Sequence, residues 1–223
     1  TAVILLLGYV VVWAIFQRRW SLLVWTFGSL GLLTAVAMLF IQDWPIQWVR
    51  TLMESPDPLV GYSSGGVFAT WWPGLGARLG WVLTAILGLI LLAEWWLAAR
   101  REGFTAFFWT ACLTLAASPL LGIPTTPVNH LLLFIPLVFI WAVWSERMEK
   151  AGKWVILTSM ALVLVLPWGI FLSNSAAAGG TIPLARLLFP LPLLLMAGLY
   201  WIRWWAVRPV RTVMDELRLR GEL

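Results

Sequence analysis

The chain of 223 residues is 61% hydrophobic and only 11% charged, with a mean hydropathy of +0.90. Soluble domains carry about a quarter charged residues, so this composition excludes an ordinary water-soluble fold, and it equally excludes a disordered chain. A single cysteine (Cys112) and a single histidine (His130) exclude an intramolecular disulfide and a multi-histidine metal or haem site. The sequence therefore predicts an all-α integral membrane protein with no metal or cofactor.

Seven apolar stretches reach or approach the roughly 20 residues that a helix needs to cross the hydrocarbon core. In chain order they are Thr1–Gln17, Ser21–Gln42, Ala77–Ala99, Phe104–Leu121, Asn129–Ser145, Lys153–Leu172 and Pro183–Val207. The fourth is the weakest, because Ser118-Pro119 interrupts its end. The alternation typical of a transmembrane barrel is absent. We expect residues 1–223 to form a single transmembrane helical domain.

The distribution of lysine and arginine predicts the orientation of these spans. Three cations lie in or beside alternate loops (Arg50, Arg78 and Arg186), whereas the other set of loops and the tail holds twelve of the fifteen. By the positive-inside rule the twelve face the cytoplasm, so Thr1 lies outside and Leu223 inside. The pI near 10.1 then reflects topology and not a nucleic-acid partner. We expect a multi-pass protein of the bacterial plasma membrane, with residues 208–223 forming a cytoplasmic tail on anionic lipid.

The first span is short for its task. Seventeen helical residues cover about 25 Å, against a hydrocarbon core of about 30 Å. Neither an initiator methionine nor a signal peptide precedes Thr1. We therefore expect the chain to be the C-terminal part of a longer polytopic protein that is truncated upstream of Thr1.

The longest segment predicted at the outer face is Asp43–Gly76. Trp44, Trp48 and Leu52 follow one another at a spacing of four residues, which predicts a short amphipathic helix lying in the membrane interface. The second half is rich in proline, glycine and serine, which is typical of a loop. A loop of this length is uncommon unless it is functional or disordered.

The second outer segment, SPLLGIPTTPVNH over residues 118–130, contains three prolines and a glycine. It predicts a rigid re-entrant or surface connection. Asn129 can cap the following helix, which leaves His130 in the first turn of that helix. A third segment, residues 173–182, is small and polar and indicates no chemistry.

Charged residues inside the spans are rare, whereas an ion pump would carry a row of them across the membrane. Glu94 lies within a span, six residues before Arg100, and we expect it to snorkel to the interface or to pair with that arginine. Phosphate-loop, serine-hydrolase, zinc-protease and kinase motifs are all absent. The concentration of polar residues at one face favours chemistry on a lipid-linked substrate over transport through the membrane.

A set of sequence elements in a fixed order resembles a known family. QRRW follows the first span, DWPIQWVRTLM follows the second, and AASPLLGIPTTPVNHLLLFIPL follows two more. This order resembles the C-terminal half of the GT-C membrane glycosyltransferases, in particular glycosyltransferase family 87, whose members use polyprenyl-phosphomannose. In that family a Pro-x-x-His element opens a helix that runs into Leu-Leu-Leu-x-x-Pro. Pro127 to His130, followed by Leu131–Leu133 and Pro136, fits this element.

The resemblance departs from the family pattern in one place and implies a specific reaction. The usual Ser-Pro is only partly matched, because Ser118-Pro119 lies too early and Thr126-Pro127 occupies its site. The resemblance implies transfer of a hexose, with mannose expected, from a polyprenyl-phosphate donor to an extracytoplasmic lipid or glycan acceptor. It places the catalytic base in an outer loop upstream of Thr1, and it agrees with the expected truncation, because family members often have Lys-Pro-Gln just before the first helix seen here.

This reaction requires groups that stabilise the departing phosphate. His130 at an outer helix start is the candidate catalytic residue, since the helix dipole there favours an anion; the alternative is an interfacial histidine bonded to a carbonyl. The expected substrate-binding residues are Asn129, Arg186, Arg50, Asp43 and Asp57. The alternative for the two arginines is snorkelling to lipid headgroups, and the alternative for the two aspartates is ordinary solvation in a loop.

Two other functions remain open from the sequence. A transporter or lipid flippase would call for inverted repeats, and the two halves show no self-similarity, although Pro167 and Pro190-Leu191-Pro192 could break helices. A non-catalytic membrane subunit would use the eighteen tryptophans to pack against a partner.

Overall fold

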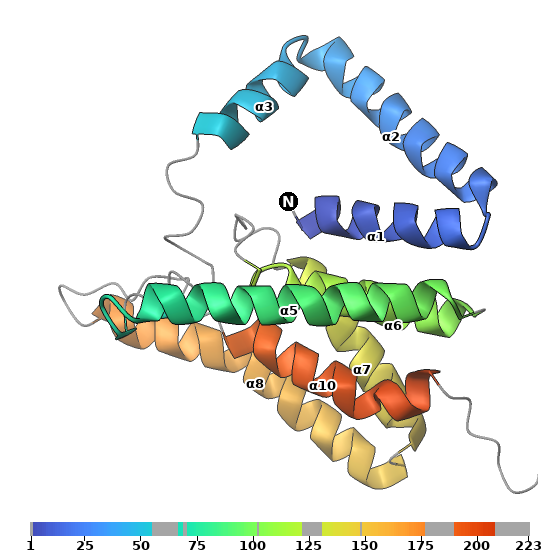
Figure 1. Cartoon of the computed structure of the whole chain (residues 1–223). Helices are drawn as coiled ribbons and strands as arrows, with labels where there is room; N and C mark the ends of the chain where they lie inside the picture. Colours follow the sequence, from blue (N-terminus) through green and yellow to red (C-terminus); the bar gives the residue numbers. More distant parts are fainter. Residues whose placement is uncertain are drawn as a thin grey trace, which may run out of the picture.

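The computed structural model describes residues 2–54, 67–68, 71–101, 103–121, 131–147, 149–176 and 190–207. The regular elements of these residues are all helical, which confirms the all-α class. The helices, shown in Figure 1, are α1 (Ala2–Phe16), α2 (Trp20–Phe40), α3 (Trp44–Glu54), α5 (Gly76–Ala99), α6 (Phe104–Ala117), α7 (Phe134–Arg147), α8 (Glu149–Ala176) and α10 (Pro190–Val207).

Helices α1, α2, α5 and α6 begin and end within a few residues of the stretches expected from the apolar runs. Helix α7 begins later than expected, at Phe134, after a turn of 3₁₀ helix at residues 131–133. This start places Pro136 in the first turn of the α-helix. A proline is tolerated there, because the N–H that it lacks would have no partner within the helix. Helix α3 occupies the stretch for which an interfacial helix is expected, and its placement in an interface stays a prediction.

The centre of the bundle is α6, which packs against α1, α5, α7 and α10. Its side chains from Trp109 to Ala117 are all buried. Most of them are small (alanine, threonine and cysteine), and small side chains let neighbouring helices approach closely. The stretch that looked weakest as a membrane span is therefore the most enclosed helix that the structure describes.

Two tryptophans connect α6 to its neighbours by hydrogen bonds. The Nε1–H of Trp109 donates to the carbonyl oxygen of Leu199 in α10 at 2.9 Å. The Nε1–H of Trp95 in α5 donates to the Thr114 hydroxyl of α6 at 2.8 Å. The Thr114 hydroxyl in turn donates to the Thr110 carbonyl at 2.8 Å. A buried indole N–H needs an acceptor, so these bonds fix how α5 and α10 sit against α6.

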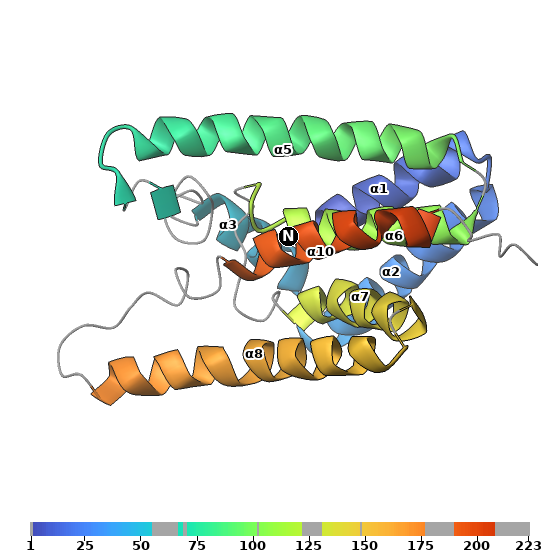
Figure 2. The same ribbon diagram turned by 90° about the horizontal axis from the view of Figure 1, so that it is seen from below.

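One end of the molecule carries the basic loops. The turn after α1 (residues 17–19), the turn after α5 (residues 100–101) and the end of α7 lie at this same end in both Figure 1 and Figure 2. The side-chain amide of Gln17 donates to the carbonyl of Ala99 at 2.8 Å and to that of Arg101 at 3.2 Å. These bonds satisfy carbonyls that the end of α5 leaves without a helical partner. We call this end of the bundle the basic end.

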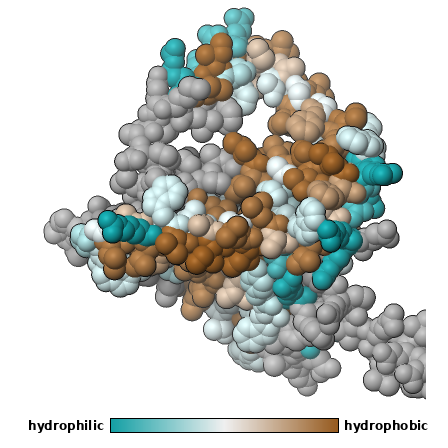
Figure 3. Space-filling view, in the orientation of Figure 1, coloured by the Kyte–Doolittle hydropathy of each residue, from teal (hydrophilic) through white to brown (hydrophobic). Residues whose placement is uncertain are grey.

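Helices α2 and α3 extend away from the rest of the bundle (Figure 1). Helix α2 contains no buried residue, and only Leu22 and Leu23 near its start pack against the main core. The visible face in Figure 3 is hydrophobic along the middle of α5 and over much of α1 and α2, and hydrophilic residues gather at helix ends.

Within the described residues, α2 and α5 are the helices long and apolar enough to cross a membrane. Shorter apolar helical stretches are Val3–Phe16, Phe104–Ala117, Gly152–Val163 and Pro190–Arg203. An α-helix rises 1.5 Å per residue, so the fourteen residues of α6 cover about 21 Å and do not reach across a core of about 30 Å on their own. The seven-span topology therefore stays a prediction.

Candidate functional site

Two of the predicted site residues lie on or beside α3. Asp43 is exposed, and its backbone carbonyl accepts a hydrogen bond from the Gln47 N–H at 2.9 Å. Arg50 is exposed about two turns further along the helix. The other four predicted site residues lie outside the described residues: Asp57, Asn129, His130 and Arg186. The roles predicted for all six residues therefore stay predictions.

A small hydrophobic cluster joins the two outer segments that the sequence singles out. Val67, from the segment 43–76, is only 2% exposed and packs with Leu87 of α5 and with Leu120. Leu120 belongs to the segment 118–130 and follows the end of α6. Phe68 packs against the same cluster. We call these residues the outer cluster; they place part of the long outer segment beside the segment that leads to His130.

Next to the outer cluster, three aromatic rings form a corner. The rings of Trp71 and Trp72 are nearly perpendicular (87°) with centroids 6.3 Å apart, and each side chain is about half exposed. Phe68 lies nearly parallel to Trp72, at 6.1 Å, and edge-on to Trp71, at 5.8 Å. The corner thus displays aromatic surface at the end of the bundle opposite the basic end, and such surface suits either a membrane interface or the C–H face of a sugar ring.

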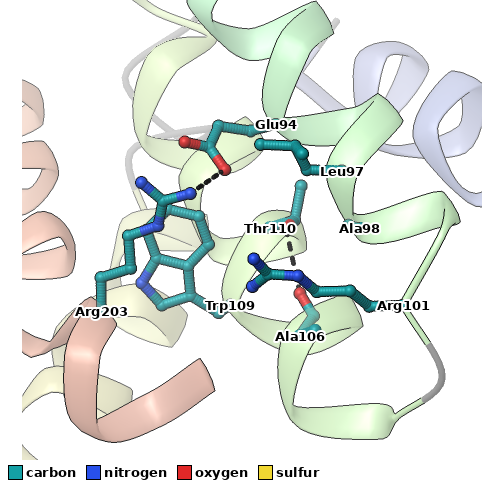
Figure 4. A pocket seen from close by; sticks show the side chains of 8 residues that line it. All are labelled: Glu94, Leu97, Ala98, Arg101, Ala106, Trp109, Thr110 and Arg203. Atoms are coloured by element: carbon teal, nitrogen blue, oxygen red, sulfur yellow. Dashed lines mark hydrogen bonds and ion pairs between the residues drawn. The ribbon is translucent and has the colours of Figure 1, made fainter. Parts of the chain in front are cut away.

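A buried ion pair lies near the basic end (Figure 4). Glu94 of α5 is 8% exposed, and its Oε2 accepts a hydrogen bond from Nη2 of Arg203 in α10 at 2.8 Å. The Tyr200 hydroxyl, one turn earlier on α10, donates to Oε1 of the same carboxylate at 3.5 Å. The carboxylate therefore has a charged and a neutral donor, as a buried charge requires.

The expected partner of Glu94 was wrong. Glu94 pairs with Arg203, whereas the guanidinium of Arg100 lies 4.4 Å from the ring centroid of Trp96. The reason is geometric: six residues along a helix amount to 600° of rotation, which places Arg100 away from the face that Glu94 presents to α10. Arg203 also lies over the ring of Trp109, with 5.2 Å between Cζ and the ring centroid, in a cation–π contact.

The cavity beside this pair is too small for a substrate. It has a volume of about 10 Å³ and is bordered by Glu94, Arg101, Thr110 and Arg203, among others. A volume of this size is about what a single water molecule occupies. The Thr110 hydroxyl at its wall already donates to the Ala106 carbonyl at 3.0 Å. We conclude that the ion pair connects three helices and is not a binding pocket for an organic ligand.

A much larger space lies between α7, α8 and α10. It is a groove of about 620 Å³, within the range of 300–1,000 Å³ that is typical of ligand sites. Its walls are mostly aliphatic and aromatic, and they include Trp141, Trp144, Trp154 and Trp201. We call this space the tryptophan groove.

Sequence reasoning missed both the partner of Glu94 and the tryptophan groove. A signal for the first was present, since Arg203 is an arginine inside a predicted span and four residues from its end, at the same membrane depth as Glu94. No comparable signal existed for the groove, because tryptophans near span ends are typical of any membrane protein.

Comparisons with protein-family models, with curated proteins and with solved structures find no match to this chain. Among the described residues, no three histidine, cysteine, aspartate or glutamate side chains are grouped so that they could hold a metal ion. The site must therefore be judged from its own residues.

Proposed function

We propose that the chain is part of an integral membrane glycosyltransferase that moves a hexose, with mannose expected, from a polyprenyl-phosphate donor to a lipid or glycan acceptor outside the cytoplasm. The protein crosses the plasma membrane seven times in this proposal, with Thr1 outside. The shared position of three basic loops at one end of the bundle supports this orientation. The opposite end is then the extracytoplasmic face on which the chemistry takes place.

The observation that carries the proposal is the outer cluster. Val67 and Leu120 come from segments 53 residues apart in the chain, and both are almost fully buried where those segments meet. The second segment leads directly to the Pro-x-x-His element that carries the resemblance. The long outer segment packs against the start of this second segment, at Leu120. Such packing supports a site at the membrane surface, since a covering segment can shield reacting groups from water.

In the proposed reaction, the acceptor hydroxyl oxygen attacks C1 of the hexose. The bond between C1 and the phosphate oxygen breaks, polyprenyl phosphate leaves with the electron pair, and the hydroxyl proton passes to a base. His130 donates a hydrogen bond to the departing phosphate. The exposed faces of Trp71 and Trp72 suit the C–H face of the hexose ring.

Membranes that contain the full-length protein test the proposal, with a radiolabelled polyprenyl-phosphate hexose as donor and the transferred label as readout. Loss of one donor to a developing charge typically lowers a rate by about 10²–10³-fold. We expect His130→Ala to lower transfer by this amount and His130→Gln to recover part of it, since glutamine keeps an N–H.

The matched control is Glu146→Gln, which changes an exposed side chain at the end of α7, on the basic end of the bundle. This variant should leave transfer unchanged. All variants must reach the membrane in equal amounts. Full activity of the His130→Ala variant would refute the assigned role of His130, and no transfer from any polyprenyl-phosphate hexose would refute the proposed reaction.

A second candidate function, a non-catalytic subunit of a larger membrane assembly, is favoured by α2. This helix is apolar along its whole length and contains no buried residue, so either lipid or another polypeptide covers it. Purification in mild detergent separates the two functions. A subunit would co-purify with a protein partner and lack transferase activity on its own.

A further inference from the structure

The tryptophan groove has walls from three helices. Leu137 and Ile140 of α7, Val155 and Leu162 of α8, and Leu194 of α10 are among the aliphatic side chains that line it. Among its few polar groups, the indole N–H of Trp144 is buried without a hydrogen-bond partner among the described residues. The Nε1–H of Trp141 donates to the Ser159 hydroxyl at 2.8 Å, and that hydroxyl donates to the Ile156 carbonyl at 2.9 Å. Such walls favour a hydrocarbon chain over a polar ligand.

The end of the groove nearest the basic end is marked by aromatic rings. Trp154 and Trp201 line the groove and are 71% and 63% exposed. The ring of Trp144 lies edge-on to Trp201, with 6.2 Å between centroids. Exposed tryptophans are typical of the level of the lipid headgroups, so this end of the groove lies at that depth if the bundle sits in a membrane.

Two cations lie at the same level. Arg147 follows Trp144 by three residues, which places the two side chains on the same face of α7. Lys153 directly precedes Trp154 at the start of α8. Both cations are exposed. Arg203 of α10, by contrast, is paired with Glu94.

We propose that the tryptophan groove holds one hydrocarbon chain of an anionic glycerophospholipid, whose phosphate lies between Arg147 and Lys153. The chain contacts the aliphatic walls, and the charged headgroup stays at the level of the exposed tryptophans. The positions of the cations decide in favour of a lipid over a helix of another copy, because an apolar helix gains nothing from two cations at the groove mouth, whereas a phosphate is attracted to both. This lipid site is separate from the proposed transfer site, which lies at the other end of the bundle.

Native mass spectrometry of the protein in mild detergent tests the proposal. The protein is first delipidated and then mixed with equal amounts of phosphatidylglycerol and phosphatidylcholine. We expect phosphatidylglycerol to be retained preferentially. Each cation near a membrane surface contributes about fivefold to binding of an anionic lipid, so Arg147→Gln and Lys153→Gln should each lower the preference by roughly this factor. The control is Arg78→Gln, which removes an exposed cation at the start of α5, at the end of the bundle opposite the basic end. This variant should leave the preference unchanged.

A second pair of variants tests the groove itself. Leu162→Trp adds bulk from an exposed position on α8, and Ala197→Leu adds bulk from an exposed position on α10. Both should abolish retention of either lipid, and the melting temperature reports whether each variant folds. Equal retention of the two lipids, or retention unchanged in Leu162→Trp, would overturn the proposal. A lipid-free dimer that Leu162→Trp converts to a monomer would overturn it in favour of a second copy as the occupant.

Discussion

Replacing one member of the Glu94–Arg203 pair should have unequal effects on stability, depending on which member is replaced. The side chain of Glu94 is 10% exposed, whereas that of Arg203 is 33% exposed. Arg203→Met leaves a carboxylate buried without its charged partner, and breaking a buried pair in this way costs about 3–5 kcal/mol. It also removes the cation–π contact with Trp109, which is worth about 0.5–1 kcal/mol.

Glu94→Gln should be milder for two reasons. The amide oxygen still accepts a hydrogen bond from Arg203, and the Arg203 side chain is one third exposed, so its charge is not fully buried. The loss is then that of charge assistance in one hydrogen bond, about 1–2 kcal/mol. In the double variant no charge is buried without a partner, so Arg203→Met should cost only about 1–2 kcal/mol in the Glu94→Gln background.

The measurement is a double-mutant cycle of unfolding free energies, obtained by titrating the detergent-solubilised protein with sodium dodecyl sulfate and following circular dichroism. The expected coupling is at least about 2 kcal/mol, or more than tenfold in the unfolding equilibrium. Glu146→Gln, on an exposed position of α7, should change stability by less than about 0.5 kcal/mol. Equal losses for the two single variants, or additive losses in the double variant, would refute the reasoning.

Two further predictions concern topology and packing. A cysteine introduced at the exposed position Asp43 should react with a membrane-impermeant maleimide in intact cells, and one at the exposed position Lys153 should not. The native Cys112, which is 1% exposed, should stay unlabelled in both variants. The reverse pattern would invert the proposed topology. A Cβ at Gly198 would lie 2.9 Å from Cδ1 of Ile140, the mobile end of that side chain. Gly198→Ala should therefore gain less than the ~0.5–1 kcal/mol that this change normally gains within a helix, and Ile140→Val in the same chain should recover the difference. A full gain in the single variant, measured by thermal melting, would show that the Ile140 side chain shifts freely.

Most helix boundaries could be predicted from the sequence because apolar runs and charged turns alternate clearly. The end of α1 at Phe16 and that of α5 at Ala99 both precede arginine pairs, and a helix crossing a membrane ends where charges meet water. The α-helix α7 is described from Phe134, after a 3₁₀ turn at residues 131–133, whereas Asn129 was expected to cap it. Asn129 and His130 lie outside the described residues, so the cap stays a prediction. Four of the six predicted site residues lie outside the described residues, so the structure leaves their roles as predictions.

The arrangement of helices in space was much harder to predict than their bounds. Apolar composition indicates that a helix prefers lipid to water, but it does not indicate which helix another helix prefers. Leucines gain little by moving from lipid to a helix interface, because lipid tails are equally apolar. Helix α2 is one of the two helices among the described residues that are long and apolar enough to cross a membrane, and it has no buried residue. Hydropathy therefore does not predict which helices are buried in the bundle and which lie at its surface.

The central position of α6 follows instead from its polar and small residues. Thr110, Thr114 and Ser118 recur every four residues, so their side chains form a stripe along one face of the helix. All three are buried, and each hydroxyl donates to a carbonyl oxygen three or four residues earlier in the chain. Of the three, Thr114 also accepts the hydrogen bond from Trp95 of α5. A hydroxyl stripe of this kind favours the interior of a helical bundle, where small side chains allow close packing and a hydroxyl can accept a bond from a neighbouring helix. Ser118, which with Pro119 makes Phe104–Leu121 the weakest span, thus belongs to the stripe that favours this helix as the one around which the others pack.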